Sequence, residues 1–281
     1  MSRASSTAKA RVHRVRGGKE EDADDVVAAE EPLEIRVVER RPGGDHEHSL
    51  SVTMRTPGDD FDLAAGFLYA ESILRSRADL DRIEYCVPRE QEQEYNIVSV
   101  VLREGVTFDA SRTIRAFYTT SACGICGKAT LDAVKIREPP HLPEDRPRIR
   151  RQTMAAWPDV LRRKQGLFEK TGGLHAAALF DEGGALTALR EDVGRHNAVD
   201  KVVGEAFLRG ALPLNDRALL VSGRAGFEIL QKALSAGIPF VASVGAPSSL
   251  AVDTAQEFGM TLVGFLRGDS FNVYAGSQRV A

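Results

Sequence analysis

The sequence predicts an α/β protein in which a three-layer domain with a mixed sheet follows a smaller, β-rich unit. Across residues 153–281, short apolar runs alternate with helical patterns, which is typical of a buried sheet covered by helices on both faces. Two of these runs, 176–180 and 185–190, flank Gly183-Gly184, a hairpin signature that introduces antiparallel strands. Across residues 32–138, alternation of apolar and polar residues predicts a separate α+β domain.

The first domain is expected to combine strands with one helix before its last loop. Strands are predicted at 33–39, 50–54, 83–87 and 95–102, with a turn at Pro42-Gly43-Gly44. Asp59 or Asp60 is expected to cap the amphipathic helix that follows the second strand. Cys86 is expected to be a small buried residue of the third strand.

The second domain follows a regular order. A helix is predicted at 157–170, ended by Gly172-Gly173, and the hairpin comes next. Further helices are expected at 196–208, 226–236 and 249–258, and further strands at 218–221, 240–244, 262–266 and 271–274.

Two segments are expected to lie outside the domains. Residues 1–31 carry basic residues and then acidic ones with almost nothing apolar to bury, which predicts a disordered tail. A basic arm that contacts nucleic acid is the alternative for this segment. Residues 139–152 hold prolines among charged residues and are expected to be a linker.

Composition excludes several classes of protein. The 281 residues are 43% hydrophobic and 27% charged, which is ordinary for a globular protein. No apolar run reaches the roughly 18 residues of a membrane span, and no signal peptide opens the chain, so we expect a cytoplasmic protein without membrane contact. The net charge of -3 argues against general nucleic-acid binding, so an anionic ligand would need a local basic site.

The clearest chemical motif is Cys123-Gly124-Ile125-Cys126, in a loop rich in glycine and hydroxyl groups ahead of a helical pattern. A C-x-x-C loop, the start of a helix and Lys128 all favour the thiolate over the thiol. Four interpretations remain open: half of a zinc site completed by Cys86 and a histidine, a dithiol oxidoreductase, an inert packing pair, or covalent chemistry through a persulfide.

A second motif, residues 191–201, ends one hairpin strand and opens a helix, and it contains Arg195 and His196. A helix start beside an arginine is suited to an anion. Nucleotide deaminases of the cytidine-deaminase type place H-x-E on the helix after such a hairpin and P-C-x-x-C at the next helix start. Here the glutamate and both cysteines are missing, so the layout is deaminase-like without the zinc catalysts. His196 and His175 can also be purely structural residues.

Loops at other strand-to-helix turns are expected to meet at the same sheet edge, where ligands bind in open α/β sheets. They are residues 222–226, with Arg224, residues 245–249, and residues 265–270. Arg267 could hold a phosphate, and Asp269 could accept hydrogen bonds from a guanine edge or a ribose.

Taken together, these residues resemble the FdhD family of formate dehydrogenase accessory proteins. The resemblance covers the chain from about residue 31 to its end, and the tail before it has no counterpart. The matching segments are 31–33, 51–60, 65–68, 120–127, 172–175, 191–201 and 222–224.

The resemblance implies a homodimeric sulfurtransferase with a cytidine-deaminase-like domain. Such a protein takes sulfur from a cysteine desulfurase as a persulfide and passes it to the bis(molybdopterin guanine dinucleotide) molybdenum cofactor of formate dehydrogenase. Cys123 is then the carrier and Cys126 an accessory, and no tightly bound zinc is expected. The cofactor site is expected at Phe265, Leu266, Arg267, Gly268, Asp269 and Ser270, with Arg195, His196 and Arg224. The alternatives are a chaperone that binds the cofactor without covalent chemistry and a zinc-dependent nucleotide hydrolase.

Overall fold

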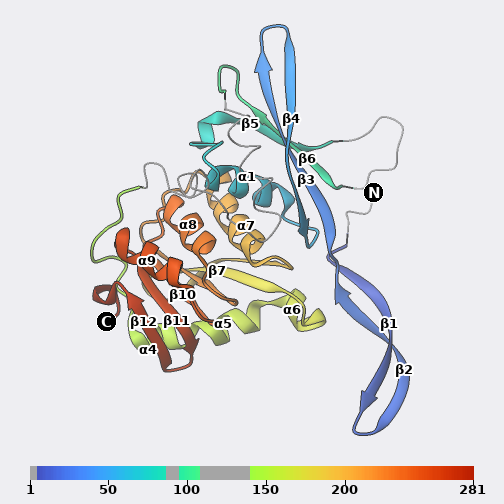
Figure 1. Ribbon diagram of the computed structural model, residues 1–281, viewed down its shortest axis with the longest axis vertical. Coiled ribbons are helices and arrows are strands. Elements are labelled where there is room, and N and C mark those ends of the chain that lie inside the picture. The colour runs from blue at the N-terminus through green and yellow to red at the C-terminus, as the bar shows by residue number, and fades with distance from the viewer. Residues whose placement is uncertain (1–4, 87–94, 108–139) are drawn as a thin grey trace.

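The computed structural model describes residues 5–86, 95–107 and 140–281. Two sheets and a separate hairpin account for the strands of these ranges (Figure 1). The larger sheet has the order β12-β11-β10-β9-β7-β8, with β9, β10 and β11 parallel and the other neighbours antiparallel. Its strands are β7 (His175–Asp181), β8 (Leu186–Asp192), β9 (Arg217–Val221), β10 (Phe240–Ser243), β11 (Thr261–Arg267) and β12 (Ser270–Ala275). The predicted mixed sheet is confirmed.

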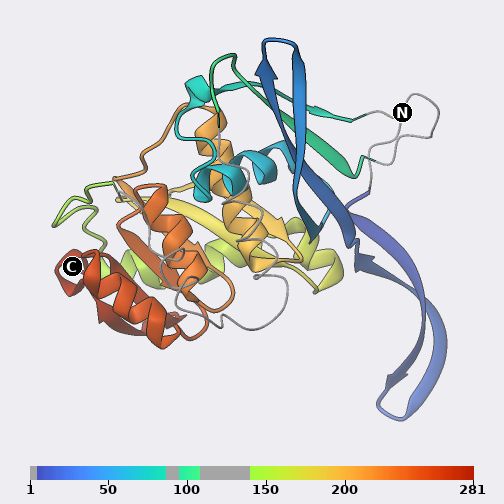
Figure 2. The same ribbon diagram turned by 45° about the horizontal axis from the view of Figure 1, so that its top comes forward.

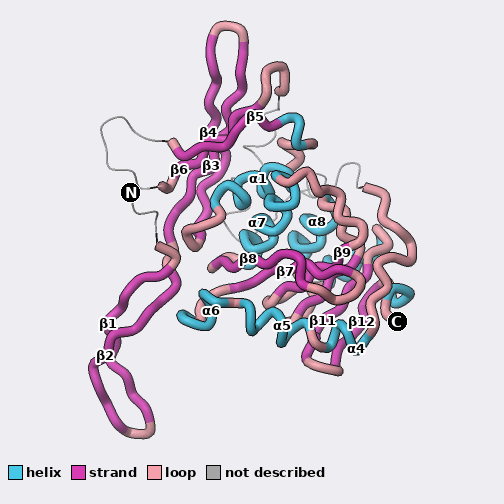
Figure 3. The backbone as a smooth tube through the Cα atoms, turned by 180° about the vertical axis from the view of Figure 1, so that it is seen from behind, coloured by secondary structure: helices cyan, strands magenta, loops and turns pink. Residues whose placement is uncertain are grey.

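Helices cover both faces of this sheet, which confirms the three-layer prediction (Figure 3). On one face lie α7 (Arg195–Leu208), α8 (Phe227–Ser235) and α9 (Ser249–Glu257), and on the other lie α4 (Arg151–Ala155), α5 (Trp157–Lys164) and α6 (Gly166–Thr171). Side chains alternate accordingly along β7, because Leu179 packs with the α7 side and Phe180 with the α5 side. Trp157 of α5 stacks on Phe180 with ring centroids 4.6 Å apart.

The smaller sheet has the order β4-β3-β6-β5, with β3 and β6 parallel. It is formed by β3 (Glu31–Arg41), β4 (Gly44–Arg55), β5 (Leu80–Tyr85) and β6 (Ile97–Leu102), and α1 (Asp60–Ala70) packs on it, followed by the short helix η1 (Arg77–Asp79). A second short helix, η2 (Ser277–Arg279), follows β12 in the larger unit. The predicted smaller β-rich unit is therefore present in the described residues.

The two units meet where α1 crosses α7. A Cβ atom added to Gly66 would lie 1.9 Å from the carbonyl oxygen of Asp200, and one added to Gly204 would lie 1.8 Å from that of Asp62. Only glycine lets the two helix backbones approach so closely. The helix that packs on the small sheet, α1, therefore also anchors the smaller unit to the larger domain.

The tail prediction is wrong over residues 7–28. These residues form the hairpin of β1 (Thr7–Arg16) and β2 (Lys19–Ala28), here called the arm, around Gly17-Gly18 with positive φ at both glycines. Two basic residues of β1 face acidic residues of β2, with Arg11 opposite Asp24 and Arg14 opposite Glu21, and opposite charges across a strand pair stabilise it. The backbone hydrogen bonds between β1 and β2 order this segment, although it has few apolar residues to bury.

Several boundaries also differ from prediction. The expected helix at 157–170 is two helices, because Gln165 leaves the helical region (ψ 77°) just before Gly166, a poor helix former. The capping prediction fails: Asp59 has φ 55° and no capping hydrogen bond, and Asp60 is drawn to Arg55. Cys86 follows β5 and is half-buried rather than buried. The first helix of the larger domain, α4, begins at Arg151, two residues before the predicted boundary at 153, and Ile149 of the expected linker is already buried in the core of that domain.

Within the described ranges, no helix combines the length and apolar character that crossing a lipid bilayer requires.

Candidate functional site

Three loops come together at one edge of the larger sheet, as predicted. The parallel strands β9, β10 and β11 all end there, and their loops are joined by backbone hydrogen bonds. Gly245 donates to the carbonyl of Gly223 at 3.0 Å, and Phe265 donates to the carbonyl of Gly245 at 3.0 Å. Ala225 donates to Ala246 at 3.2 Å. The loops after three strands thus form one continuous surface.

Glycine at this edge makes room for its neighbours. A Cβ atom on Gly245 would lie 2.9 Å from the carbonyl oxygen of Gly223 and 3.2 Å from the Cα atom of Arg224. One on Gly223 would lie 3.3 Å from Nδ1 of His175 and 3.9 Å from Cδ of Arg195. The structure therefore brings Arg195 and Arg224 to the same edge, together with His175.

His196 is the second residue of α7 and pairs with the second residue of α8. Its Nε2 atom lies 3.0 Å from Oε2 of Glu228. Burial lowers the pKa of His196 to about 4, outweighing the opposite effect of Glu228, and Arg195 lowers it further. Burial and then Arg195 also lower the pKa of His175. Both imidazoles are therefore neutral near pH 7, and the positive charge of this edge comes from arginine and the helix starts.

A buried ion pair holds the start of α7 in place. The carboxylate of Asp192 lies 2.8 Å from Nζ of Lys201, and both side chains are almost fully buried. Asp192 also accepts hydrogen bonds from the backbone N–H of Gly194 at 2.8 Å and from Nδ2 of Asn197 at 2.9 Å. It further accepts one from the N–H of Thr56 at 3.2 Å, and Lys201 donates to the carbonyl of Thr56 at 3.0 Å. Much of the 191–201 motif thus fastens α7 to the segment after β4.

That segment has its own buried anchor, which sequence reasoning missed. The guanidinium of Arg55 is fully buried and makes two hydrogen bonds of 3.1 Å to the carboxylate of Asp60. It also donates to Glu31 at 3.1 Å and to the carbonyl of Tyr95 at 2.9 Å. The polar residues of the 51–60 motif are visible in the sequence, but the sequence does not show that Arg55 is buried.

The segment predicted to bind the cofactor forms the end of β11 and the turn into β12. Phe265 is 40% exposed with φ 55°, and Arg267, Gly268, Asp269 and Ser270 are exposed in the turn. Leu266 differs from them, because its side chain is fully buried in the core between the sheet and α5. Any contact of Leu266 with a ligand would be made by its backbone. The role of the whole segment stays a prediction.

A hollow of about 690 Å³ adjoins this edge on the side of α5 and α6. Its polar members include Arg162, whose guanidinium lies 4.1 Å from the ring centre of Phe168. Gln165 is 5% exposed, and its Nε2 atom has no hydrogen-bond partner. The lining is formed by Pro158, Leu161, Arg162, Gln165, Phe168, Gly172, Gly173, Leu174, His175, Ser222 and Val244. Apolar walls with a few converging polar groups are typical of sites for small organic rings.

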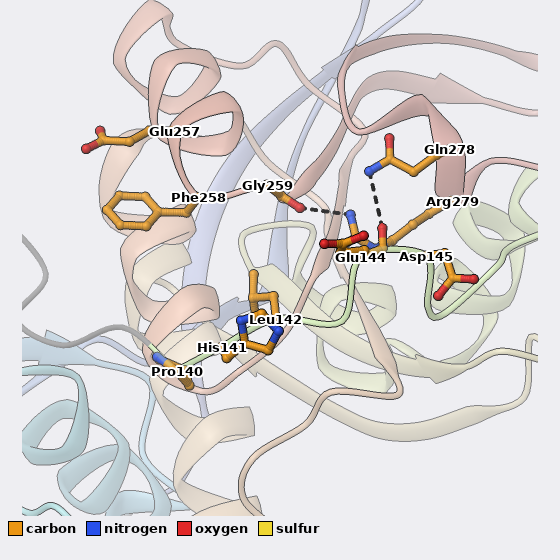
Figure 4. A pocket seen from close by; sticks show the side chains of 10 residues that line it. All are labelled: Pro140, His141, Leu142, Glu144, Asp145, Glu257, Phe258, Gly259, Gln278 and Arg279. Carbon is orange, nitrogen blue, oxygen red and sulfur yellow. Dashed lines mark hydrogen bonds between the residues drawn. The ribbon is translucent and has the colours of Figure 1, made fainter.

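Sequence reasoning missed this hollow, although Gly172-Gly173 and His175 were noted for other reasons. Its remaining wall comes from the break between α5 and α6, which the sequence pattern did not predict. A second hollow, of about 590 Å³, lies at the opposite edge of the sheet, before β11 (Figure 4). There the buried Arg279 donates to the carbonyls of Gly259 and Arg146, so it ties the linker to the chain end. No predicted site residue lines it.

Cys123 and Cys126 lie outside the described residues, so the fold gives them no position. Cys86 is a free thiol. Among the described residues, no group of three or more potential ligands could hold a metal ion.

Fold and site together define a two-unit α/β protein in which the start of α7 presents arginine and neutral imidazole at the edge of a mixed sheet. The FdhD/NarQ family matches residues 28–281, and the chain belongs to that family.

Known proteins resemble this chain over nearly its whole length. It is 52% identical over 278 residues to a protein of Streptomyces coelicolor named "Sulfur carrier protein FdhD", covering 98% of this chain and 96% of the relative. A protein of the same name from Mycobacterium tuberculosis is 49% identical over 280 residues, covering 98% and 99%. The expectation that the first 31 residues lack a counterpart is therefore wrong for these relatives, whose alignments extend into the arm.

A solved structure supports the fold. A crystal structure of a Desulfotalea psychrophila protein, described as a formate dehydrogenase accessory protein, superposes with a TM-score of 0.74 at 24% identity. The superposition covers 98% of this chain and 99% of that one.

Proposed function

We propose that this protein is a cytoplasmic sulfur carrier in the maturation of formate dehydrogenase. The observation that carries the proposal is the 52% identity, over nearly the whole chain, to a protein named as a sulfur carrier. The C-x-x-C motif at 123–126 supplies a nucleophile suited to this role. The structure supports a phosphate-bearing ligand at the sheet edge, where arginines and helix starts favour anions.

The sulfur reaches the protein by thiol exchange. The thiolate of Cys123 attacks the outer sulfur of a persulfide on a cysteine desulfurase. A new S–S bond forms to Cys123, the donor's S–S bond breaks, and the donor cysteine leaves as a thiolate. This step exchanges one persulfide for another and needs no external oxidant.

Release of the sulfur involves the second cysteine. The thiolate of Cys126 attacks the inner sulfur of the Cys123 persulfide, a Cys123–Cys126 disulfide forms, and hydrosulfide leaves toward the bound substrate. A dithiol reductant then restores both thiols. The substrate that receives the sulfur is the bis(molybdopterin guanine dinucleotide) molybdenum cofactor.

The sheet edge and its hollow are the proposed site for that substrate. Arg195, Arg224 and Arg267 bind its phosphates, aided by the N–H groups at the starts of α7 and α8. The guanine ring enters the hollow beside Phe168, where the unpartnered Nε2 of Gln165 can donate to a ring acceptor. His196 and His175, both neutral, add hydrogen-bonding groups without positive charge.

Two measurements test the carrier role. After incubation with a desulfurase and cysteine, mass spectrometry should find one added sulfur atom on Cys123, and Cys123→Ala should not restore formate dehydrogenase activity to a deletion strain. Cys126→Ala should accept sulfur and release it slowly. A Cys123→Ala protein that restores full activity would instead support the chaperone without covalent chemistry.

Binding of a guanine nucleotide tests the site. Titration calorimetry with GDP should show at least about a tenfold loss of affinity for Arg195→Ala, since a charge-assisted hydrogen bond contributes about 1.5–3 kcal/mol. Arg209→Ala is the matched control, because Arg209 is exposed at the far end of the same helix. Equal affinities for the two variants would place the phosphates elsewhere.

A further inference from the structure

A strongly basic segment lies over the outer face of the larger sheet. Residues 146–170 hold eight basic and two acidic side chains, an excess of six positive charges in a chain whose net charge is -3. The segment leads into α4 and continues through α5 and α6, which follow one another across that face (Figures 1 and 3). The eight basic residues, here called the basic ridge and all exposed, are Arg146, Arg148, Arg150, Arg151, Arg162, Arg163, Lys164 and Lys170.

Packing against the sheet turns these side chains outward. Ile149 is fully buried in the core beneath the segment, and side chains alternate along an extended chain. Arg148 and Arg150, on either side of Ile149, therefore point to solvent. In α5, Leu161 is buried against the sheet, and the two arginines that follow it are turned away by about 100° per residue. The ridge thus stands on the side of the layer that faces water.

The described residues do not neutralise the ridge. None of its eight side chains forms an ion pair with a carboxylate in the described part of the chain. Glu182 accepts a hydrogen bond only from the backbone N–H of Arg148, at 3.2 Å. By contrast, Arg82 on the small sheet is exposed but lies 2.9 Å from a carboxylate oxygen of Glu84. The ridge therefore projects a positive potential from a protein that is acidic as a whole.

Acidic residues bound the ridge at both ends. Glu144 and Asp145 directly precede its first residue. At the other end, α6 packs beside the base of the arm, and five of the six residues 20–25 in β2 are acidic (Figures 1 and 2). A nucleic acid longer than the ridge would run along these carboxylates with one charge per about 1.7 Å of duplex. The two helices α4 and α5 span about 20 Å, which suits a compact acidic patch on a folded protein.

The ridge adjoins the hollow through α5. This helix contributes Pro158, Leu161 and Arg162 to the lining of the hollow, so Arg162 belongs to both features. A protein that docks on the ridge therefore stands beside the proposed ligand site. The recipient of the ligand needs that position, whereas a sulfur donor needs only to reach the C-x-x-C motif at 123–126.

We infer that the basic ridge is the docking surface for an acidic face of the protein that receives the ligand. Six of its eight residues are arginine, whose planar guanidinium binds a carboxylate through two parallel hydrogen bonds. Complementary charge speeds the encounter of two proteins and fixes how they are oriented. The inference rests on the proposed function for the ligand in the hollow and for formate dehydrogenase as its recipient.

Binding to formate dehydrogenase that lacks its cofactor tests the ridge. Biolayer interferometry with the full-length protein at about 50 mM and about 500 mM NaCl should show tighter binding at low salt, where charges are less screened. Arg148→Glu/Arg151→Glu should weaken binding at low salt by at least about tenfold, and less at high salt. Arg75→Glu/Arg103→Glu is the matched control, because it makes the same change in charge at exposed positions of the smaller unit and should bind as the wild type does.

Three outcomes would overturn the inference. One is wild-type affinity of Arg148→Glu/Arg151→Glu, and another is a wild type that does not bind the cofactor-free enzyme. In either case the proposed function stands if the wild type restores formate dehydrogenase activity to a deletion strain, and falls with the inference if it does not. The third is binding of a DNA duplex, followed by fluorescence anisotropy, that is as tight as that of the enzyme and is lost in the same variant. Arg148→Gln/Arg151→Gln, with circular dichroism unchanged, should bind with intermediate affinity, which separates loss of charge from misfolding.

Discussion

Lys201→Met should be among the most destabilising substitutions in the larger domain. It removes the cation from a pair whose two side chains are 2% and 0% exposed, leaving the carboxylate of Asp192 buried without a counter-charge. Loss of one partner from a buried ion pair costs about 3–5 kcal/mol. Asp192 keeps three other donors, from Thr56, Gly194 and Asn197, so the lower end, about 3 kcal/mol, is expected.

The assay is urea unfolding followed by circular dichroism, with thermal unfolding as a second measure. A loss of about 3 kcal/mol corresponds to a fall in Tm of roughly 6–12 °C for a domain of this size. Lys164→Met, at the exposed end of α5, is the control and should change stability by less than about 0.5 kcal/mol.

The double variant Asp192→Asn/Lys201→Met sharpens the test. Because it removes both charges, it should be less destabilised than the sum of the single variants, with a coupling energy of about 1–3 kcal/mol. If the free energy of unfolding of Lys201→Met is within about 1 kcal/mol of the wild-type value, the buried ion pair does not anchor α7.

Three further predictions concern the contact between two helices, the pH response and ligand binding. Gly66→Ala should destabilise by at least about 1–3 kcal/mol in urea unfolding, because its Cβ would overlap the carbonyl of Asp200, whereas Gly166→Ala, with open space around it, should be neutral or stabilising. A neutral result for Gly66→Ala would mean that α1 and α7 separate easily. His196 has a lowered pKa of about 4 when folded and an ordinary value near 6.5 when unfolded, so the unfolded chain binds a proton that the folded one does not. The free energy of unfolding should therefore fall as pH drops from 6.5 toward 4, and His196→Gln should make this fall smaller. If the pH dependence of the variant equals that of the wild type, other groups cause it. Gln165→Ala should weaken GDP binding by about fivefold without loss of stability, since its amide nitrogen has no partner to lose; unchanged binding would leave the hollow without a role in recognising the ring.

Local pattern predicted most of the larger domain. Strands 176–180 and 185–190 appear as β7 and β8, and the positions of Arg195, Arg224 and Arg267 at or just beyond strand ends follow directly from the strands before them. Hydrophobic periodicity depends on residues close together in the sequence, so it can be recognised without knowledge of the fold. The convergence of these loops at one edge was also predictable, because the carboxyl ends of parallel strands share an edge.

Other features depended on contacts between distant residues. Residues 7–28 offered almost nothing apolar locally, and only the register of β1 against β2 made them an ordered arm. Arg55 and Lys201 are ordinary charged residues in the sequence, and burial of each beside a carboxylate 5 or more positions away became visible only in the fold. The same holds for the hollow that Gln165 lines.

The sequence by itself determined the α/β class, the place of the C-x-x-C motif and the loops expected to meet at one sheet edge, because each follows from residue types and short spacings. Tertiary structure alone decided how α1 meets α7 at Gly66 and Gly204, which charged side chains are buried, and that residues 7–28 pair into an arm. These depend on which surfaces exclude water when distant segments pack, and burial is a property of the whole assembly of elements.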